Sequence, residues 1–189
     1  MALFLETNRL LLRTFQDSDL EAFLAYRSDP AVARYQGWEA PYSRAAAVAF
    51  VQEMNEKTPA TPGEWYQLAI ELKDSGGIIG DCAFHTLEDA RQADIAFTLS
   101  RGYQGQGYAT EAVKRMLDYI FGELGLHRVR AIADVKNLAS VRLLKRIGMR
   151  REGHFVENIW FKGEWGSEYY YGLLKREWEQ LKMDGMGCA

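Results

Sequence analysis

The chain has few of the residues that build disulfide-bonded or metal-dependent proteins. Its 189 residues include two cysteines and three histidines. Cys82 and Cys188 are too few for a disulfide framework, and the second lies at the terminus. His85, His127 and His154 lie far apart and lack the spacing of metal ligands. We therefore expect neither structural disulfides nor a bound metal.

Long apolar runs and an excess of positive charge are also missing. No apolar run approaches the roughly 18 residues that would span a membrane, and we expect no signal peptide before Leu10. The formal net charge of −3 argues against a protein that binds nucleic acid mainly through its phosphates. Repeats, low-complexity tracts and linkers are absent from the sequence. We expect a single domain over residues 1–189, cytoplasmic, without nucleic-acid or membrane partners, and either a monomer or a homodimer.

A glycine-rich stretch, Arg101 to Ala112, lies near the middle of the chain. An alternating run ends just before it at Leu99, and apolar residues at helical spacing begin inside it. These apolar residues are Ala109, Ala112, Val113, Met116, Leu117, Ile120 and Phe121. A strand, a glycine turn and a helix start would expose unpaired N–H groups at the positive end of a helix dipole. The stretch therefore predicts a site for a phosphate or pyrophosphate.

Two common phosphate-loop patterns do not fit this stretch. A dinucleotide fingerprint that begins at Gly105 would need a third glycine or alanine where Thr110 stands. A Walker loop would need lysine after its last glycine, but Tyr108 follows Gly107. A nucleotide-dependent enzyme is therefore disfavoured.

The other predicted elements outline a mixed sheet. We expect strands at residues 3–13, 65–72, 78–87, 92–99, 128–135, 149–155 and 167–174. Helices are expected near Asp17, ending before Pro30, from Ser43, and from Asn137 to Ile147, with a turn over 31–37 and a turn or helix over 175–182. Antiparallel hairpins with one β-α-β crossover imply an α/β (α+β) fold, mostly antiparallel, with helices on both faces of the sheet.

Two motifs carry a family resemblance. Gln104-x-x-Gly107-x-Ala109 resembles the Gln/Arg-x-x-Gly-x-Gly/Ala signature of the GCN5-related N-acetyltransferases (GNAT family), whose loop holds the pyrophosphate of coenzyme A. Asn137-x-x-Ser140, with Gly148-Met149 further on, resembles the second motif of that family. Both stand in the order and separation that the family needs. The resemblance implies a GNAT-like acyl-CoA N-acyltransferase fold.

Further stretches extend the resemblance over residues 6–178, which we expect to form the core of the domain. They are Glu6 to Phe15, Arg151 to Gly153, Lys162 to Trp165 and Tyr171 to Trp178, and they look like the ribosomal-protein-alanine acetyltransferase-like branch. Two positions depart from the family pattern. Ser167 stands where that branch usually has aspartate. Leu144 occupies the place of the tyrosine that acts as general acid in much of the family.

The resemblance implies an N-acetyltransferase that uses acetyl-CoA as co-substrate and no metal. An acetyl group would pass to a primary amine, a protein N-terminal α-amine or a small-molecule amine, by direct attack in a ternary complex. The amine must be neutral, which costs a lysine-type amine roughly 4–5 kcal/mol at pH 7 and an α-amine about 1. A base would therefore help, whereas the thiol leaves easily as thiolate and Leu144 does not disqualify an enzyme. A catalytically silent CoA-binding or interaction domain is the alternative.

The resemblance also implies a set of site residues. Donor binding falls to Phe97, Thr98, Leu99, Gln104, Gly105, Gln106, Gly107, Tyr108, Ala109, Thr110, Asn137 and Ser140. The main chain of residues 97–99 would pair with the pantetheine amides. Asp94 is the first candidate base and could work through water, with Glu157, Glu71 and His85 as rivals. Each rival could instead be a solvated or structurally hydrogen-bonded polar group. Ser140 could donate a hydrogen bond to the sulfur or could serve only as a helix cap.

Two further groups are candidates for binding roles. The basic side chains could meet the nucleotide phosphates or simply form a solvated face. They are Arg142, Lys145, Arg146, Arg150 and Arg151. The aromatic side chains could line an acceptor pocket or pack in the core. They are Tyr35, Trp38, Tyr42, Trp65, Tyr66, Trp160 and Phe161.

Overall fold

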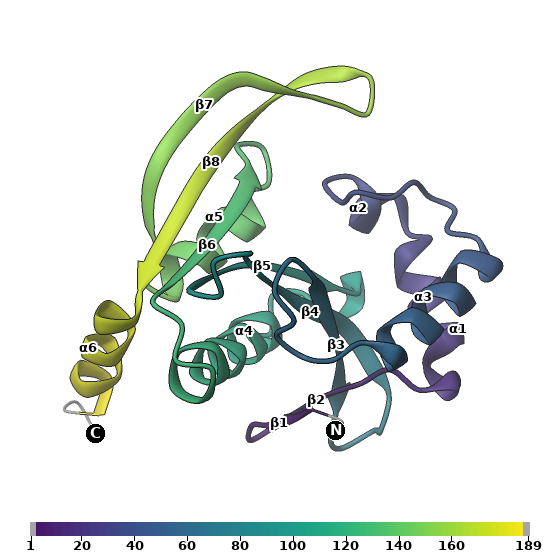
Figure 1. Cartoon of the computed structure of the whole chain (residues 1–189). Helices are drawn as coiled ribbons and strands as arrows, with labels where there is room; N and C mark the ends of the chain where they lie inside the picture. The colour runs from purple at the N-terminus through teal and green to yellow at the C-terminus, as the bar shows by residue number, and fades with distance from the viewer. Residues whose placement is uncertain (1–2, 187–189) are drawn as a thin grey trace.

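The protein is built on one eight-stranded sheet, seen in a computed structural model that describes residues 3–186 (Figure 1). The strand order is β1-β2-β3-β4-β5-β6-β8-β7. The strands are β1 Phe4–Glu6, β2 Leu10–Arg13, β3 Trp65–Leu72, β4 Ile78–Thr86, β5 Gln92–Leu99, β6 Arg128–Asp134, β7 Arg150–Phe161 and β8 Glu164–Leu174. All neighbours are antiparallel except β5 and β6, which are parallel. The predicted mixed, mostly antiparallel sheet is confirmed.

Helices cover both faces of this sheet, as expected. They are α1 Leu20–Arg27, α2 Pro30–Ala33, α3 Arg44–Glu56, α4 Tyr108–Asp118, α5 Leu138–Arg146 and α6 Lys175–Met186. Leu68 and Ile70 of β3 pack in one core with α4, while Ala69 between them packs in a second core with α1 and α3. Side chains alternate across a strand, so these two cores lie on opposite faces. Over residues 3–186, none of the helices is long and apolar enough to cross a membrane.

Three expected boundaries are wrong. The first expected strand is two strands, β1 and β2, joined by a turn in which Thr7 N donates to Leu10 O over 3.0 Å. Residues 30–33 form a short helix instead of a turn, because Asp29 caps it and Pro30 opens it. The last two strands are longer than expected and form a hairpin that rises from the body (Figure 1). Most of β7 is exposed and bulged, so apolar alternation could not mark its length.

The sheet opens between β5 and β6. These strands pair only over Gln92–Asp94 and Arg128–Arg130. Beyond this point β5 stays with β4 as far as Leu99, while β6 stays with β8 as far as Asp134. The glycine stretch and α4 follow β5 directly, and α5 follows β6. The opening therefore lies beside both sequence motifs.

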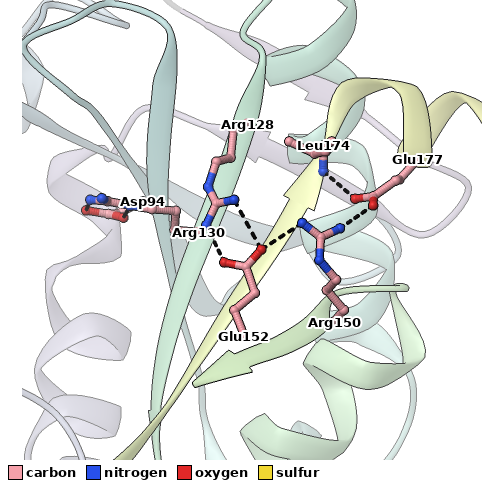
Figure 2. A network of polar contacts seen from close by, with 7 residues as sticks. All are labelled: Asp94, Arg128, Arg130, Arg150, Glu152, Leu174 and Glu177. Carbon is pink, nitrogen blue, oxygen red and sulfur yellow. Dashed lines mark hydrogen bonds and ion pairs between the residues drawn. The ribbon is translucent and has the colours of Figure 1, made fainter. Parts of the chain in front are cut away.

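Charged side chains tie the C-terminal strands to α6 (Figure 2). Glu152 accepts hydrogen bonds from Arg128 Nη1 at 3.1 Å and Arg150 Nη2 at 2.7 Å. Arg150 also pairs with Glu177, which accepts from Leu174 N at 2.8 Å. The hydrogen bond from Arg128 is the main cause that lowers the pKa of Glu152. The hydrogen bond and positive charge of Arg150 lower it further. A Cβ on Gly172 would lie 2.5 Å from this carboxylate, so a larger side chain at this strand position would displace Glu152.

Candidate active site

The glycine stretch forms an open loop at the start of α4. Gly105 and Gly107 have φ angles of 77° and 87°, in the left-handed region that favours glycine. Gly107 is the N-cap of α4, and no side chain caps the helix there. The first N–H groups of α4 are therefore left to bind an anion.

A cavity of about 510 Å³ lies between this loop, β5 and α5. The predicted donor residues that line it are Phe97, Thr98, Leu99, Gln104, Gly105, Gly107, Tyr108, Ala109, Thr110, Asn137 and Ser140. Gln106 is not among the lining residues, and its side chain instead donates to Gly102 O at 3.0 Å. The structure thus brings together all but one of the residues predicted to bind the donor.

The main chain of β5 faces this cavity at alternate residues. Ser100 N donates to Ile79 O of β4, at 2.8 Å, so residues of the same parity as Ser100 face β4. Phe97 and Leu99 have the other parity and face the opening, where Gln104 Nε2 donates to Leu99 O at 2.9 Å. Gln36 Nε2 lies 3.5 Å from Phe97 O. An added extended ligand could therefore pair with this edge.

A second cavity, of about 230 Å³, adjoins the first across the sheet opening. Five residues line both, namely Tyr35, Gln36, Phe97, Asn137 and Ser140. Apolar residues of β5, β6, α5 and β7 form most of the wall of this second cavity. Two ligands, one in each cavity, would therefore meet beside Ser140.

Two carboxylates line the second cavity, and the sequence reasoning missed both. Asp134 and Glu168 are register partners on β6 and β8. Asp134 Oδ1 accepts from Lys136 N at 2.6 Å, and Glu168 Oε2 accepts from Asn158 Nδ2 at 2.6 Å. The sequence alone does not show that these two residues are neighbours, because they meet only when β6 pairs with β8, which is distant in sequence.

The four candidate bases lie outside both cavities. Asp94 stands at the last β5–β6 pair, where Arg130 donates to its two oxygens at 2.7 and 2.9 Å. His85 Nδ1 lies 3.7 Å from Asp94, with its ring stacked on Trp65. Glu71 pairs with Arg13 at 2.5 Å.

Glu157, the remaining candidate base, lies on the projecting hairpin. It has a φ of 48° in a bulge of β7, its side chain is exposed, and its N–H donates to Ser167 Oγ at 2.9 Å. Ser167 thus holds the bulge at the position where aspartate was expected.

Ser140 and Leu144 take the positions that the second motif implies. Asn137 Oδ1 accepts from Ser140 N at 3.2 Å, so Asn137 is the helix cap. Within residues 3–186 the Ser140 hydroxyl has no hydrogen bond to protein, and Ser140 lines both cavities. Leu144 is buried and lines the second cavity, which leaves that position without a hydroxyl.

Only part of the basic cluster reaches the cavity of about 510 Å³, which we call the donor cavity after its predicted ligand. Arg142 and Arg146 line it, and Arg146 Nη1 donates to Thr110 Oγ1 at 3.3 Å. Arg150 belongs instead to the network of Figure 2, and Arg151 stacks 4.6 Å from the ring centre of Tyr169. Lys145 does not line the cavity.

The aromatic candidates likewise divide between site and core. Tyr35 and Phe161 line the second cavity. Trp38 and Tyr42 enclose the buried guanidinium of Arg27, and Tyr66 is a core residue. Trp65 covers His85, and Trp160 lies exposed against Trp165.

Comparison with known proteins identifies the family. The family model described as an Acetyltransferase (GNAT) domain matches residues 9–150. The chain belongs to the GNAT family. The resemblance read from the glycine loop and the Asn137 motif is thereby confirmed.

Individual GNAT relatives cover nearly the whole chain. YnaD of Bacillus subtilis (strain 168), an uncharacterized N-acetyltransferase, is 36% identical over 176 residues, 91% of this chain and 97% of its own. The crystal structure of a GNAT family acetyltransferase from Bacillus anthracis is 32% identical, with a TM-score of 0.82 over 92% of this chain and 99% of that one. This chain is therefore an acetyl-CoA-dependent N-acetyltransferase.

A more distant GNAT structure shares the fold. Spermidine N-acetyltransferase from Vibrio cholerae, solved in complex with CoA and spermine, is 22% identical, with a TM-score of 0.78 over 92% of this chain and 99% of that one.

Proposed function

We propose that this enzyme transfers the acetyl group of acetyl-CoA directly to a primary amine, in a ternary complex formed where the two cavities meet. The observation that carries the proposal is the shared wall of Phe97, Asn137 and Ser140. A donor in the larger cavity and an amine in the smaller one would bring thioester and nucleophile together there. Such proximity removes much of the entropic cost of a reaction between two substrates.

The donor would be held by main-chain groups and by two arginines. The pyrophosphate would bind the N–H groups at the start of α4, with Arg142 and Arg146 on the other wall of the cavity. The pantetheine amides would pair with Phe97 and Leu99. A main-chain N–H of β5 would then polarise the acetyl carbonyl.

The acceptor amine would enter between Asp134 and Glu168. Their carboxylates would attract the ammonium form and take up its proton, directly or through water, before attack. The Ser140 hydroxyl would donate to the departing thiolate, in place of the tyrosine that Leu144 replaces. We propose this carboxylate pair over Asp94, because Arg130 already occupies both oxygens of Asp94.

The acceptor is a small-molecule amine or a protein N-terminal α-amine. Spermidine is the acceptor that the name of the Vibrio cholerae relative gives, which supports a polyamine as one candidate acceptor for this enzyme. The apolar walls and paired carboxylates of the second cavity suit an aliphatic amine.

An acceptor screen tests the proposal. The protein is incubated with acetyl-CoA and a panel of polyamines, aminoglycosides and peptides with free N-termini, and thiol release is followed. We expect turnover with at least one amine, and a higher KM for that amine in Asp134→Asn and Glu168→Gln. Glu179→Gln, an exposed change on α6, is the control. CoA binding without turnover on any amine would contradict the proposal and favour the silent domain.

A further inference from the structure

The turn between β1 and β2 contacts the glycine loop from a distance of about a hundred residues in sequence. Thr7 Oγ1 donates to Glu111 Oε1 at 2.6 Å, and Arg9 N donates to the same oxygen at 3.1 Å. Arg9 Nε donates to Glu111 Oε2 at 2.7 Å. Arg9 Nη1 donates to Gln106 O at 3.2 Å. The turn thus binds both the loop and the first turn of α4.

Arg9 contacts the loop without lining the larger cavity, although Gly105 and Gly107 line it. Its Nη2 lies 3.4 Å from the place of a Cβ on Gly107, and its guanidinium stacks 4.3 Å from the ring centre of Tyr108. Arg9 therefore contacts the loop outside the cavity wall and leaves the N–H groups that face the cavity free.

The contact between Arg9 and Glu111 also compensates a negative charge at the start of α4. Glu111 lies in the first turn, where its charge would repel a bound diphosphate and weaken the positive end of the helix. Partial burial alone would raise its pKa, but hydrogen bonds from Thr7 and Arg9 lower the pKa overall. Glu111 therefore stays ionised, and Arg9 balances its charge.

We propose that Arg9 is a positioning residue for the donor: through Gln106 and Glu111 it holds the glycine loop open and neutralises the carboxylate beside the diphosphate. The proposal rests on the proposed function, because it needs the loop to bind CoA. It gives a role to Thr7 and Arg9, which lie in the turn between β1 and β2 and in the stretch Glu6 to Phe15 that carries part of the family resemblance.

The test compares two donors, one with the diphosphate and one without. In Arg9→Met, we expect the Kd for CoA measured by calorimetry, and the KM for acetyl-CoA, to rise at least about tenfold, as the loss of a charged hydrogen bond implies. With S-acetylpantetheine, which lacks the diphosphate, kcat/KM should not change. Arg9→Lys should recover part of the affinity, since it restores the charge but not the fork of donors.

Controls separate this role from general stability. Arg115→Met removes another arginine paired with a glutamate, Glu123, on the same stretch of helix but outside the cavity. It should leave the Kd for CoA unchanged. Should Arg9→Met fail to fold, Thr7→Val removes one hydrogen bond to Glu111 and should give a smaller rise in Kd.

The outcomes are distinct. An unchanged Kd in Arg9→Met, or an equal loss with S-acetylpantetheine, would overturn the positioning role alone. A wild-type protein that does not bind CoA would overturn the proposed function and this proposal with it.

Discussion

Gly107 is the residue whose backbone most constrains the donor loop. Its φ of 87° is strained for a β-branched side chain, and a Cβ there would lie 3.4 Å from Arg9. We expect Gly107→Val to abolish CoA binding in calorimetry. Gly102→Val is the matched control, because nothing lies within 4 Å of a Cβ at Gly102. CoA affinity retained in Gly107→Val would reject the assignment of the loop.

Ser140 is the residue for which the chemistry makes a separate prediction. Removal of a hydrogen bond to the departing thiolate should lower kcat about tenfold in Ser140→Ala, since bonds to charged groups contribute about 1.5–3 kcal/mol. The KM for acetyl-CoA should hardly change. The melting temperature should also stay constant, because Asn137 supplies the cap. An unchanged kcat would leave Ser140 with no part in the chemistry.

Individual residues show where sequence reasoning stops. The loop and helix-start residues that line the larger cavity were predictable because they lie in two continuous motifs, each tied to its own helix start. Asp134 and Glu168 were not, because they come together only through the pairing of β6 with β8. Asp94 lies at the fork of the sheet, and only the structure shows that Arg130 holds it.

At the scale of elements, the charge network of Figure 2 predicts a dependence of stability on pH. The pKa of Glu152 lies below its ordinary value of 4.5, chiefly through Arg128. A lowered pKa stabilises the folded state above the unfolded pKa, and this contribution is lost as pH falls through the folded pKa. We expect the melting temperature to fall less steeply below about pH 4.5 in Glu152→Gln than in wild type.

The same variant should be less stable at neutral pH, by about 1 kcal/mol or less, because the pair is partly exposed. Glu179→Gln provides the reference, since this exposed glutamate of α6 has no ion pair within residues 3–186. Parallel pH curves for wild type and Glu152→Gln would show that the network contributes nothing to stability.

The turn of the β7–β8 hairpin contacts the segment around α2, and Phe161, next to Lys162 in this hairpin, lines the second cavity. Lys162 Nζ donates to Ala33 O at 2.9 Å and to Trp38 O at 2.5 Å, joining the hairpin turn to the segment around α2. In Lys162→Met we expect the KM for the amine to rise about tenfold, since each bond comes from a charged donor. The KM for acetyl-CoA should stay the same in steady-state assays.

A closely matched lysine serves as the control for this hairpin contact. Lys57 is 21% exposed against 22% for Lys162 and also donates to a main-chain oxygen, Trp65 O, but lies away from the cavities. Lys57→Met should leave the amine KM unchanged. Equal effects of the two substitutions would show that the contact of Lys162 does not shape acceptor binding.

At the scale of the whole molecule, the sheet architecture followed from the order of predicted strands and helices. The predicted strand bounds differ most from the structure in the C-terminal hairpin. Most side chains of β7 are exposed, so the strand lacks the apolar alternation on which a strand prediction depends. The pairing of residues 97–99 with the pantetheine, which requires an edge of β5 free of β6, was implied by the family resemblance rather than by local pattern. No residue within either strand signals where their pairing ends, because that depends on what each strand pairs with on its other side.

Hydrogen exchange can test this opening directly. The amides of Phe97 and Leu99 face the cavity, whereas those of Ala96 and Thr98 face β4. We expect CoA to slow exchange at residues 97 and 99 and to leave residues 96 and 98 slow in both states. Protection that does not alternate along β5 would contradict pairing of the pantetheine with this edge.

The short ladder between β5 and β6 also bears on how the protein would respond to force. The first five strands join the last three by main-chain pairing over three residues on each strand. The element β1 belongs to the first group, and α6 follows the last strand of the second group in sequence (Figure 1). Acetyl-CoA bound along β5, between α4 and α5, would link these two groups of strands. A single molecule stretched from its ends in optical tweezers should therefore unfold at a higher force when acetyl-CoA is bound.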